Sequence, residues 1–185
     1  FEISVKKSVK ERCKVYQDGS YVSSRLIGDR LVILSEYYVN IGKDDEIIKE
    51  SCVPETAVNG TDFQKIPCDC VCIMNEINDT SYLVASTMEV NDSSSLQTKG
   101  VLGGGSNVYC TTETLYVTST KYENINIAKD VFGITEPKTN ILKFSIKDNK
   151  INYLGSCSVK GTALNQFSMD EYNGNLRIAT TTGSW

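Results

Sequence analysis

A repeated hairpin pattern constrains the fold of this chain more than any other feature of its sequence. A polar pair followed by apolar residues at every second position occurs at 28–35 (GDRLVILS), 112–119 (TETLYVTS) and 173–180 (NGNLRIAT). The polar pair is typical of a tight turn, and the alternation is typical of a β-strand with one buried face. Because each copy is flanked by further short strand-like segments, we expect four-stranded antiparallel sheets. The pattern predicts an all-β fold built from β-propeller blades.

The spacing of the repeats indicates two insertions. Leu31 and Leu115 are 84 residues apart, and Leu115 and Leu176 are 61 apart, whereas a plain propeller blade needs about 40 to 50 residues. We assign the excess to insertions near 40–80 and 123–139. Long loops inserted on a repetitive scaffold are where binding specificity usually lies.

About twelve strands are expected, which amounts to about three blades in one partial propeller domain covering residues 1–185. The first segment, FEISV, has the pattern of a third blade strand, and NLRIATTTGSW has the pattern of a second one. Propellers have about four to eight blades, and many combine strands from both termini in one blade. We therefore expect either a fragment of a larger propeller or an assembly of two copies through open blade edges.

The chain contains no histidine, which excludes several catalytic mechanisms. Ser-His-Asp and Cys-His activation of a nucleophile both require an imidazole. Asp170 and Glu171 are adjacent on an expected strand, so their side chains point to opposite faces and cannot flank one glycosidic bond. We expect the segment 103–106 (GGGS) to be a tight inter-blade connection rather than a phosphate cradle, because no helix or lysine follows it.

The charge of the chain argues against a nucleic-acid partner. Its formal net charge is -4, whereas phosphate binding requires clustered basic residues. The basic run at 6–14 has no interleaved aromatic platform for bases, so we expect a solvated turn and edge strand there. No apolar stretch approaches the roughly 18 residues of a membrane span, so no transmembrane segment is expected in this chain.

Seven cysteines are present, an odd number that cannot all pair within the chain. On an extended strand Cys68, Cys70 and Cys72 would place their sulfurs on one face, which makes them weak candidates for binding a soft metal ion. The sequence lacks a second ligand pair at the spacing of a zinc site, so buried thiols or disulfides are the better interpretation. We expect no cofactor.

Arg25 and Arg177 are the main candidates for ligand binding, because each lies in the repeat region beside Ser or Thr hydroxyls. Such groups tend to point toward the central channel of a propeller or its mouth. Two roles are open: an inter-blade hydrogen bond or ion pair, with Asp170 as a possible partner, and a contact to an anion or glycan. The candidate binding residues are Ser23, Ser24, Arg25, Gln166, Asp170, Arg177 and Thr181.

Three stretches resemble a known family: 21–38 (YVSSRLIGDRLVILSEYY), 103–122 (GGGSNVYCTTETLYVTSTKY) and 161–185 (GTALNQFSMDEYNGNLRIATTTGSW). They are similar to bacterial secreted proteins with a C-terminal β-propeller domain, and the insertion at 40–80 matches only around KIPCDC. The resemblance implies the fold and a secreted or cell-surface location, and it carries over no catalytic residue. Cysteines at several strand positions depart from the family pattern, which leaves the redox state open.

Together these features predict a non-catalytic binding or scaffold module that presents its insertions to a protein or glycan of the cell envelope. The alternative is a hydrolase or lyase directed at glycans or peptides, with carboxylate and tyrosine groups at the propeller mouth. A glycosidase of that kind would need two carboxyl groups about 5 to 9.5 Å apart.

Overall fold

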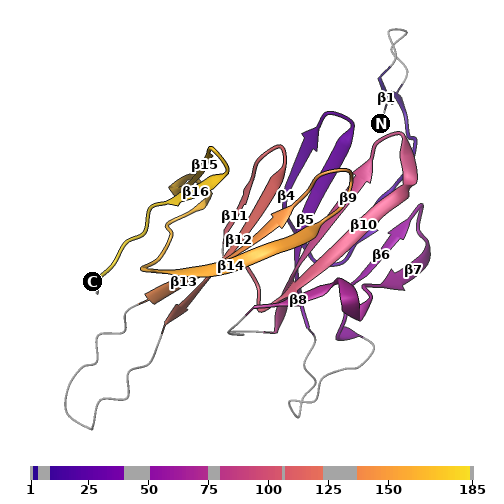
Figure 1. Ribbon diagram of the computed structural model, residues 1–185. Coiled ribbons are helices and arrows are strands. Elements are labelled where there is room, and N and C mark those ends of the chain that lie inside the picture. Colours follow the sequence, from indigo (N-terminus) through magenta and orange to yellow (C-terminus); the bar gives the residue numbers. More distant parts are fainter. Residues whose placement is uncertain are drawn as a thin grey trace.

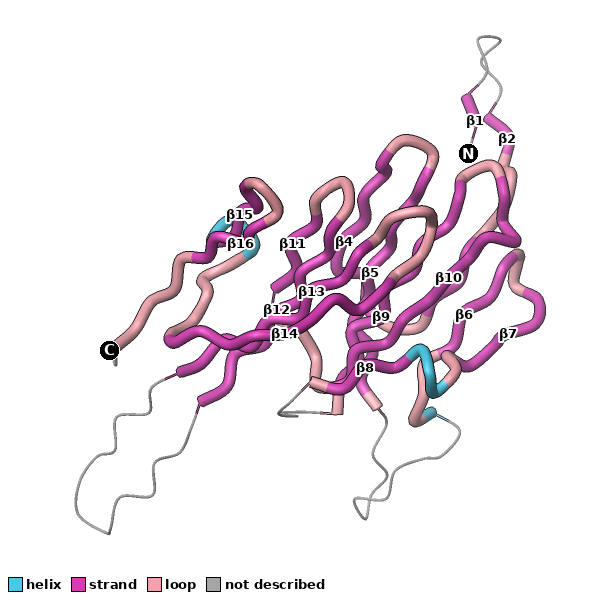
Figure 2. The backbone as a smooth tube through the Cα atoms, in the orientation of Figure 1, coloured by secondary structure: helices cyan, strands magenta, loops and turns pink. Residues whose placement is uncertain are grey.

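The structure is a computed structural model in which β-strands dominate (Figure 1). The residues that it describes are 2–3, 9–39, 51–74, 80–105, 107–122 and 137–183. Short 3-10 helices at Cys68–Cys70 (η2) and Gln166–Ser168 (η3) accompany the strands (Figure 2). Within the described residues, no helix has the length and the hydropathy that a membrane span requires.

The first blade is a four-stranded antiparallel meander with a short fifth strand at its outer edge. In spatial order its strands are β4 (Ser20–Ile27), β5 (Arg30–Tyr38), β9 (Ser81–Glu89), β10 (Asp92–Leu102) and β8 (Val71–Ile73). The turn between β4 and β5 is the Gly28-Asp29 pair of the repeat. Strand β8 runs parallel to β10, with Gly100 opposite Val71.

The second blade repeats the four-stranded meander. Its strands are β11 (Asn107–Cys110), β12 (Thr114–Tyr122), β13 (Pro137–Ser145) and β14 (Asn152–Lys160). All three pairings are antiparallel, and the turn between β11 and β12 is the Thr112-Glu113 pair of the repeat. Of the insertion expected near 123–139, only 137–139 lie within the described residues, where they begin β13.

Two hairpins supply further strands. Strands β15 (Met169–Tyr172) and β16 (Asn175–Ile178) are joined by the Asn173-Gly174 turn, the third copy of the repeat. Strands β1 (Glu2–Ile3) and β2 (Val9–Lys10) form the other hairpin. Together with the two four-stranded meanders they make twelve strands, about the number that the repeat predicts, and the described residues contain four further strands, β8 and the three strands of a separate sheet. The chain is therefore a set of propeller blades, about three in number.

The first insertion contributes two strands to a separate three-stranded sheet instead of forming only a loop. This sheet consists of β3 (Val15–Gln17), β6 (Glu55–Val58) and β7 (Thr61–Lys65), with β6 in the middle. The sheet contacts the first blade through Gln17 of β3. The Gln17 amide donates to Ser35 Oγ at 2.7 Å and to the Val84 carbonyl at 3.2 Å. Residues 40–50 and 75–79 of the insertion lie outside the described residues.

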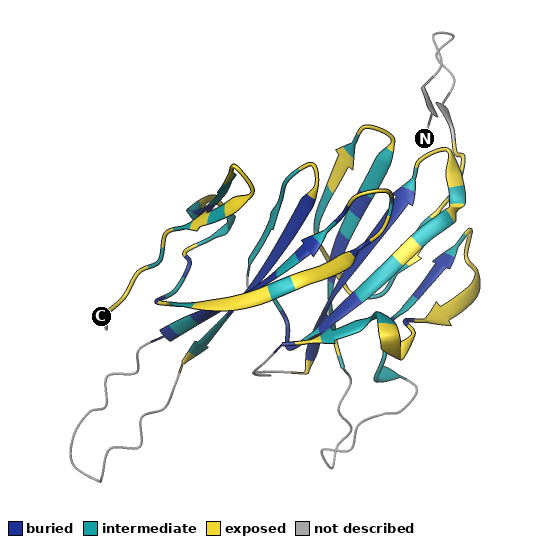
Figure 3. Cartoon of the chain, viewed as in Figure 1, coloured by how far each residue is buried: buried dark blue, intermediate teal, exposed yellow. Residues whose placement is uncertain are grey.

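The main hydrophobic core lies between the two complete blades, where the strands are most deeply buried (Figure 3). Val32 and Leu34 of β5 belong to the same buried cluster as Leu115 and Val117 of β12. The outermost strand β14 is largely exposed. The blades therefore stack face to face, as adjacent blades of a propeller do.

The burial of the repeated apolar row differs between the blades, which corrects one expectation. Leu115 and Val117 are buried as the repeat predicts, but the equivalent Leu31 and Ile33 are only half-buried. The second blade is covered on both faces, by the first blade and by the β15–β16 hairpin. The Leu31 row lies on the face of the first blade that points away from the second blade, so it lacks this cover.

The glycine segment 103–105 makes the tight inter-blade connection that the sequence predicts. The N–H groups of its first two glycines donate to the Ser81 carbonyl at 3.0 and 3.1 Å. A Cβ atom on Gly105 would lie 2.8 Å from Val117 Cγ1, so the chain passes this close to the second blade only because the residue is glycine. Ser106 lies outside the described residues.

Candidate functional site

The candidate residues on the innermost strand of the first blade make local contacts. Arg25 Nη1 donates to Ser23 Oγ at 3.0 Å and to the Ser24 carbonyl at 2.8 Å. The Ser24 hydroxyl lies 2.9 Å from the hydroxyl of Tyr21. All these residues belong to β4, so the described hydrogen bonds of Arg25 stay within one strand.

Arg30, rather than a candidate residue, makes a hydrogen bond between the two blades. Its Nη2 donates to the carbonyl of Thr112 at 2.8 Å. This bond joins the start of β5 in the first blade to the turn between β11 and β12 in the second blade. The sequence holds a signal for this contact, because Arg30 directly follows the Gly28-Asp29 turn. The signal is weak, because the residues that follow the other two repeat turns are Thr114 and Asn175, which share no chemistry with Arg30.

Arg177 and Asp170 form an ion pair. They are cross-strand partners on β16 and β15, and the guanidinium carbon also lies 5.0 Å from the ring centroid of Tyr172. The ion pair with Asp170 is thus confirmed for Arg177, although it forms within one hairpin rather than between blades. Because both partners are largely exposed, we expect the pair to contribute little to stability.

Gln166 and Thr181 lie next to the β15–β16 hairpin in the chain, before and after it. Gln166 is the first residue of η3, which Asn165 caps through a side-chain bond from the Phe167 N–H at 2.9 Å. Thr181 and Thr162 exchange backbone hydrogen bonds of 2.9 Å each. The candidate residues therefore form two groups, one on β4 and one around β15 and β16, with β11 between them (Figure 1).

A cluster of polar groups under the β15–β16 hairpin was not found from the sequence. Tyr116 is 1% exposed, and its hydroxyl donates to Glu171 Oε2 at 2.7 Å. Burial, and then the hydrogen bond to Glu171, raise the pKa of the Tyr116 phenol well above its ordinary value. Lys143 Nζ lies 5.2 Å from the centroid of the same ring and donates to the Gly174 carbonyl at 3.0 Å.

This cluster ties the hairpin to the second blade. The Glu171 carboxylate accepts the hydrogen bond from Tyr116, whereas its neighbour Asp170 pairs with Arg177 on the other face of the hairpin. The expectation that adjacent carboxylates point to opposite faces is therefore confirmed. The two groups cannot act together as the acid and base of a glycosidase.

The three clustered cysteines do not share a face. Cys68 and Cys70 lie in η2, because the chain turns after Pro67 instead of continuing as the extended strand expected from the sequence. Cys70 packs beside Tyr82 in a small cluster, whereas Cys72 on β8 packs against the main core. Burial raises the pKa of the Cys72 thiol. Cys68, Cys70 and Cys72 are free thiols, and the described residues hold no group of three or more side chains suited to a metal ion.

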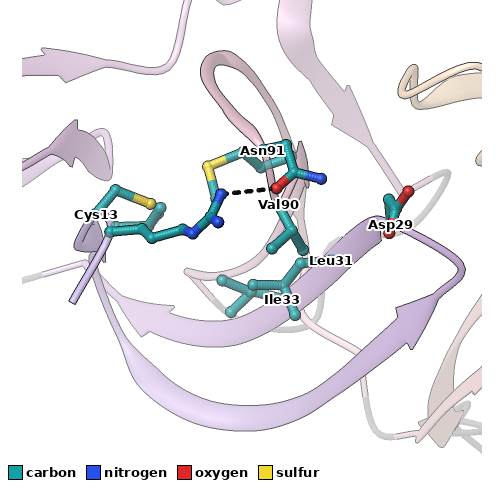
Figure 4. Close-up of a pocket in the computed structure, with 9 residues that line it drawn as sticks. Cys13, Asp29, Leu31, Ile33, Val90 and Asn91 are labelled. Carbon is teal, nitrogen blue, oxygen red and sulfur yellow. Dashed lines mark hydrogen bonds between the residues drawn. The ribbon is translucent and has the colours of Figure 1, made fainter. Parts of the chain in front are cut away.

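A crevice of about 390 Å³ opens beside the half-buried row of the first blade (Figure 4). Leu31 and Ile33 form its apolar floor, with Val90 next to them. Asn91 stands at the rim, where its Oδ1 accepts a hydrogen bond from Arg12 Nη1 at 3.0 Å. The crevice lies on the face of the first blade that carries Leu31 and Ile33. The corresponding face of the second blade is covered by the first blade.

The sheet of the insertion carries an exposed aromatic pair. The rings of Tyr16 and Phe63 meet edge to face, with centroids 5.8 Å apart, and the side chains remain 40% and 50% exposed. On β7, Asp62 accepts a hydrogen bond from Gln64 beside a hollow of about 380 Å³ that Leu96 of β10 also lines. The sequence did not single out Phe63, because one aromatic residue in a polar strand gives no periodic signal.

Comparison with known proteins places these observations in a family. A family described as beta propeller domain matches residues 1–185. An uncharacterized protein of Methanocaldococcus jannaschii is 46% identical over 48 residues, and an uncharacterized protein of Archaeoglobus fulgidus is 54% identical over 44 residues. These segments cover 26% and 24% of this chain but 6% and 7% of the two relatives, so the chain matches a small part of their length. Both relatives are archaeal and lend no support to a bacterial source, and no solved structure gives a significant match.

Proposed function

Because the chain belongs to the beta propeller domain family, we propose that it acts as a non-catalytic binding module of the cell envelope. The proposal rests on the exposed aromatic pair of the insertion sheet, Tyr16 and Phe63. Aromatic residues are enriched at protein interfaces, where they supply much of the binding energy. A secreted or cell-surface location is part of the proposal and is supported by the resemblance of 21–38, 103–122 and 161–185 to secreted proteins.

The insertion sheet suits a protein partner. All five residues of β7 are exposed, and β7 lies at the edge of its sheet with β6 on one side. An exposed edge strand can pair with an extended segment of another chain, while the aromatic pair supplies apolar contact area. Asp62 and Gln64, the neighbours of Phe63 on β7, line a separate hollow and supply hydrogen-bonding groups there.

Binding to envelope fractions of the producing cell tests this proposal. Phe63→Ser should reduce binding at least tenfold, because interface aromatics at the centre of a contact contribute about 2 kcal/mol or more. Phe167→Ser is the matched control, since Phe167 is 86% exposed and lies in η3 instead of the insertion sheet.

Two treatments of the envelope fraction identify the partner class. Protease treatment should abolish binding if the partner is a protein, and periodate oxidation should abolish it if the partner is a glycan. Equal binding by Phe63→Ser and the unmodified chain would contradict a role for this surface. Turnover of a glycan or peptide panel by the chain would instead favour the hydrolase or lyase alternative.

A further inference from the structure

The two chain segments at the open end of the β6–β7 hairpin stay paired beyond the strands themselves. Glu55 at the start of β6 lies opposite Lys65 at the end of β7. One residue further out, the N–H of Ile66 donates to the carbonyl of Pro54 at 3.0 Å. The 3-10 helix η2 follows at this end of the hairpin, where Figure 2 shows it in cyan. The segments before β6 and after β7 therefore leave the hairpin side by side.

This register brings Cys52 and Cys68 to opposite positions, because each lies two residues beyond the pair formed by Pro54 and Ile66. The backbone stays extended up to this point, since Pro67 has φ -59° and ψ 146° and η2 begins only at Cys68. Residues directly opposite in antiparallel strands have Cα atoms about 4.5–5.5 Å apart and side chains on the same face. A disulfide requires Cα atoms about 4.4–6.8 Å apart, so the register suits a cross-strand disulfide.

A tyrosine of the first blade lies beside both sulfur atoms. Burial, followed by the charges of the Cys52 and Cys68 thiolates, raises the pKa of the Tyr82 phenol. A charge changes a pKa in this way only from nearby, so both sulfur atoms lie near the Tyr82 hydroxyl. The residue before Cys52 is held at the same place, because the Ser51 carbonyl accepts a hydrogen bond of 2.5 Å from Tyr37, whose ring centroid lies 6.5 Å from that of Tyr82. The two cysteines therefore meet at this pair of tyrosines.

The two cysteines that follow Cys68 in the chain have different surroundings. Cys70 packs against the small apolar cluster around Val84, whereas Cys72 packs against the main core. Both are half-buried, and Cys68 is exposed. The thiol of Cys68 is therefore the one in this group that a reagent in solution reaches most easily.

We propose that Cys52 and Cys68 form a disulfide that fastens the open end of the β6–β7 hairpin. The oxidant is a small-molecule disulfide such as oxidised glutathione. The Cys68 thiolate attacks this disulfide, which forms a mixed disulfide and releases one glutathione thiol. The Cys52 thiolate then attacks the Cys68 sulfur and releases the second glutathione thiol. In total the two cysteines give up two protons and two electrons, which reduce the oxidant to two thiols.

The disulfide closes a loop of about 15 residues that contains both β6 and β7. Such a cross-link restricts the unfolded chain and so stabilises the folded hairpin. The strand that carries Phe63 is thereby held to the first blade at Tyr82. This inference does not depend on the proposed binding function, because it concerns only how the insertion sheet is held.

Peptide mapping of the oxidised chain identifies the bond. The folded chain is equilibrated with oxidised and reduced glutathione, the remaining thiols are blocked with iodoacetamide, and the chain is digested with trypsin and endoproteinase Asp-N. These enzymes cleave after lysine and before aspartate, so they place Cys52 in peptide 50–61, Cys68 in peptide 66–68, and Cys70 with Cys72 in peptide 69–78. We expect 50–61 linked to 66–68 as the main linked species in the mass spectrum.

Cys68→Ser should abolish this linked species, and Cys70→Ser is the matched control that should retain it. Reduction with dithiothreitol should lower the melting temperature of the oxidised chain by roughly 6–12 °C, and it should leave that of Cys68→Ser unchanged. Absence of the linked species, linkage of 50–61 to 69–78 in its place, or equal melting temperatures before and after reduction would each overturn the proposal.

Discussion

Phe144 offers the sharpest test of how strongly the two blades depend on each other. Its side chain is 1% exposed, lies in the core between the blades and meets the ring of Tyr153 edge to face at 5.8 Å. Removing a buried phenylalanine side chain costs about 3–5 kcal/mol through lost burial and the cavity that remains. For a chain of this length each kcal/mol lowers the melting temperature by about 2–4 °C, so Phe144→Ala should lower it by roughly 6–20 °C.

Denaturant unfolding followed by circular dichroism measures this loss directly. Phe167→Ala is the control, because Phe167 is 86% exposed and a surface substitution should change stability by about 0.5 kcal/mol or less. If Phe144→Ala costs no more than Phe167→Ala, the inter-blade core is not where we place it. If the loss appears as a separate transition of part of the chain, the blades unfold independently and the stacked arrangement is wrong.

Three further outcomes are expected. The free energy of unfolding that the Tyr116 phenol contributes should be fully present below pH 10 and be lost as the pH rises further, because the pKa of Tyr116 is raised above 10.0 in the folded state. In melting curves recorded at several pH values, Tyr116→Phe should weaken this loss. Gly105→Ala should cost about 1–3 kcal/mol in denaturant unfolding, because its Cβ would meet Val117 Cγ1 at 2.8 Å; an unchanged midpoint would contradict this contact. Thiol labelling of the folded chain should modify exposed Cys157 well before the partly buried Cys72, and equal rates would contradict the burial.

The blade strands were predictable because their signals are local. Each repeat turn is a polar pair between alternating apolar residues, and the three turns at 28–29, 112–113 and 173–174 all occur where the pattern places them. Burial was predicted less well, since alternation shows that one face is apolar but does not show what covers it. Leu31 and Leu115 have the same local pattern and different neighbours, so only the stacking of blades distinguishes them.

The insertion could not be predicted because its partners are distant in the sequence. Strand β3 pairs with β6 about 40 residues later, and neither segment is long enough to give a clear period. The run around Cys68 and Cys70 has the alternation of a strand, but it turns after Pro67 into a 3-10 helix. Short apolar patterns of this kind do not distinguish extended from helical structure.

The candidate site was predicted in part. Chemistry alone indicated a carboxylate partner for Arg177, and Asp170 fills that role. The sequence could not show that Arg25 is held by Ser23 and Ser24 of its own strand, because a short side-chain contact depends on rotamers rather than on spacing. The aromatic pair of the insertion sheet was not predicted, since Tyr16 and Phe63 come from strands that meet only in the folded chain.

A double-mutant cycle across the inter-blade core shows whether the chain is a stack of propeller blades with a shared core. Leu83 of the first blade and Val117 of the second both line the space beside Gly105. Unfolding free energies of Leu83→Ala, Val117→Ala and the double variant should give a coupling of about 0.5 kcal/mol or more, because both residues belong to one buried cluster. Additive effects, with a coupling below about 0.3 kcal/mol, would show that the two blades do not pack against each other and would contradict the account.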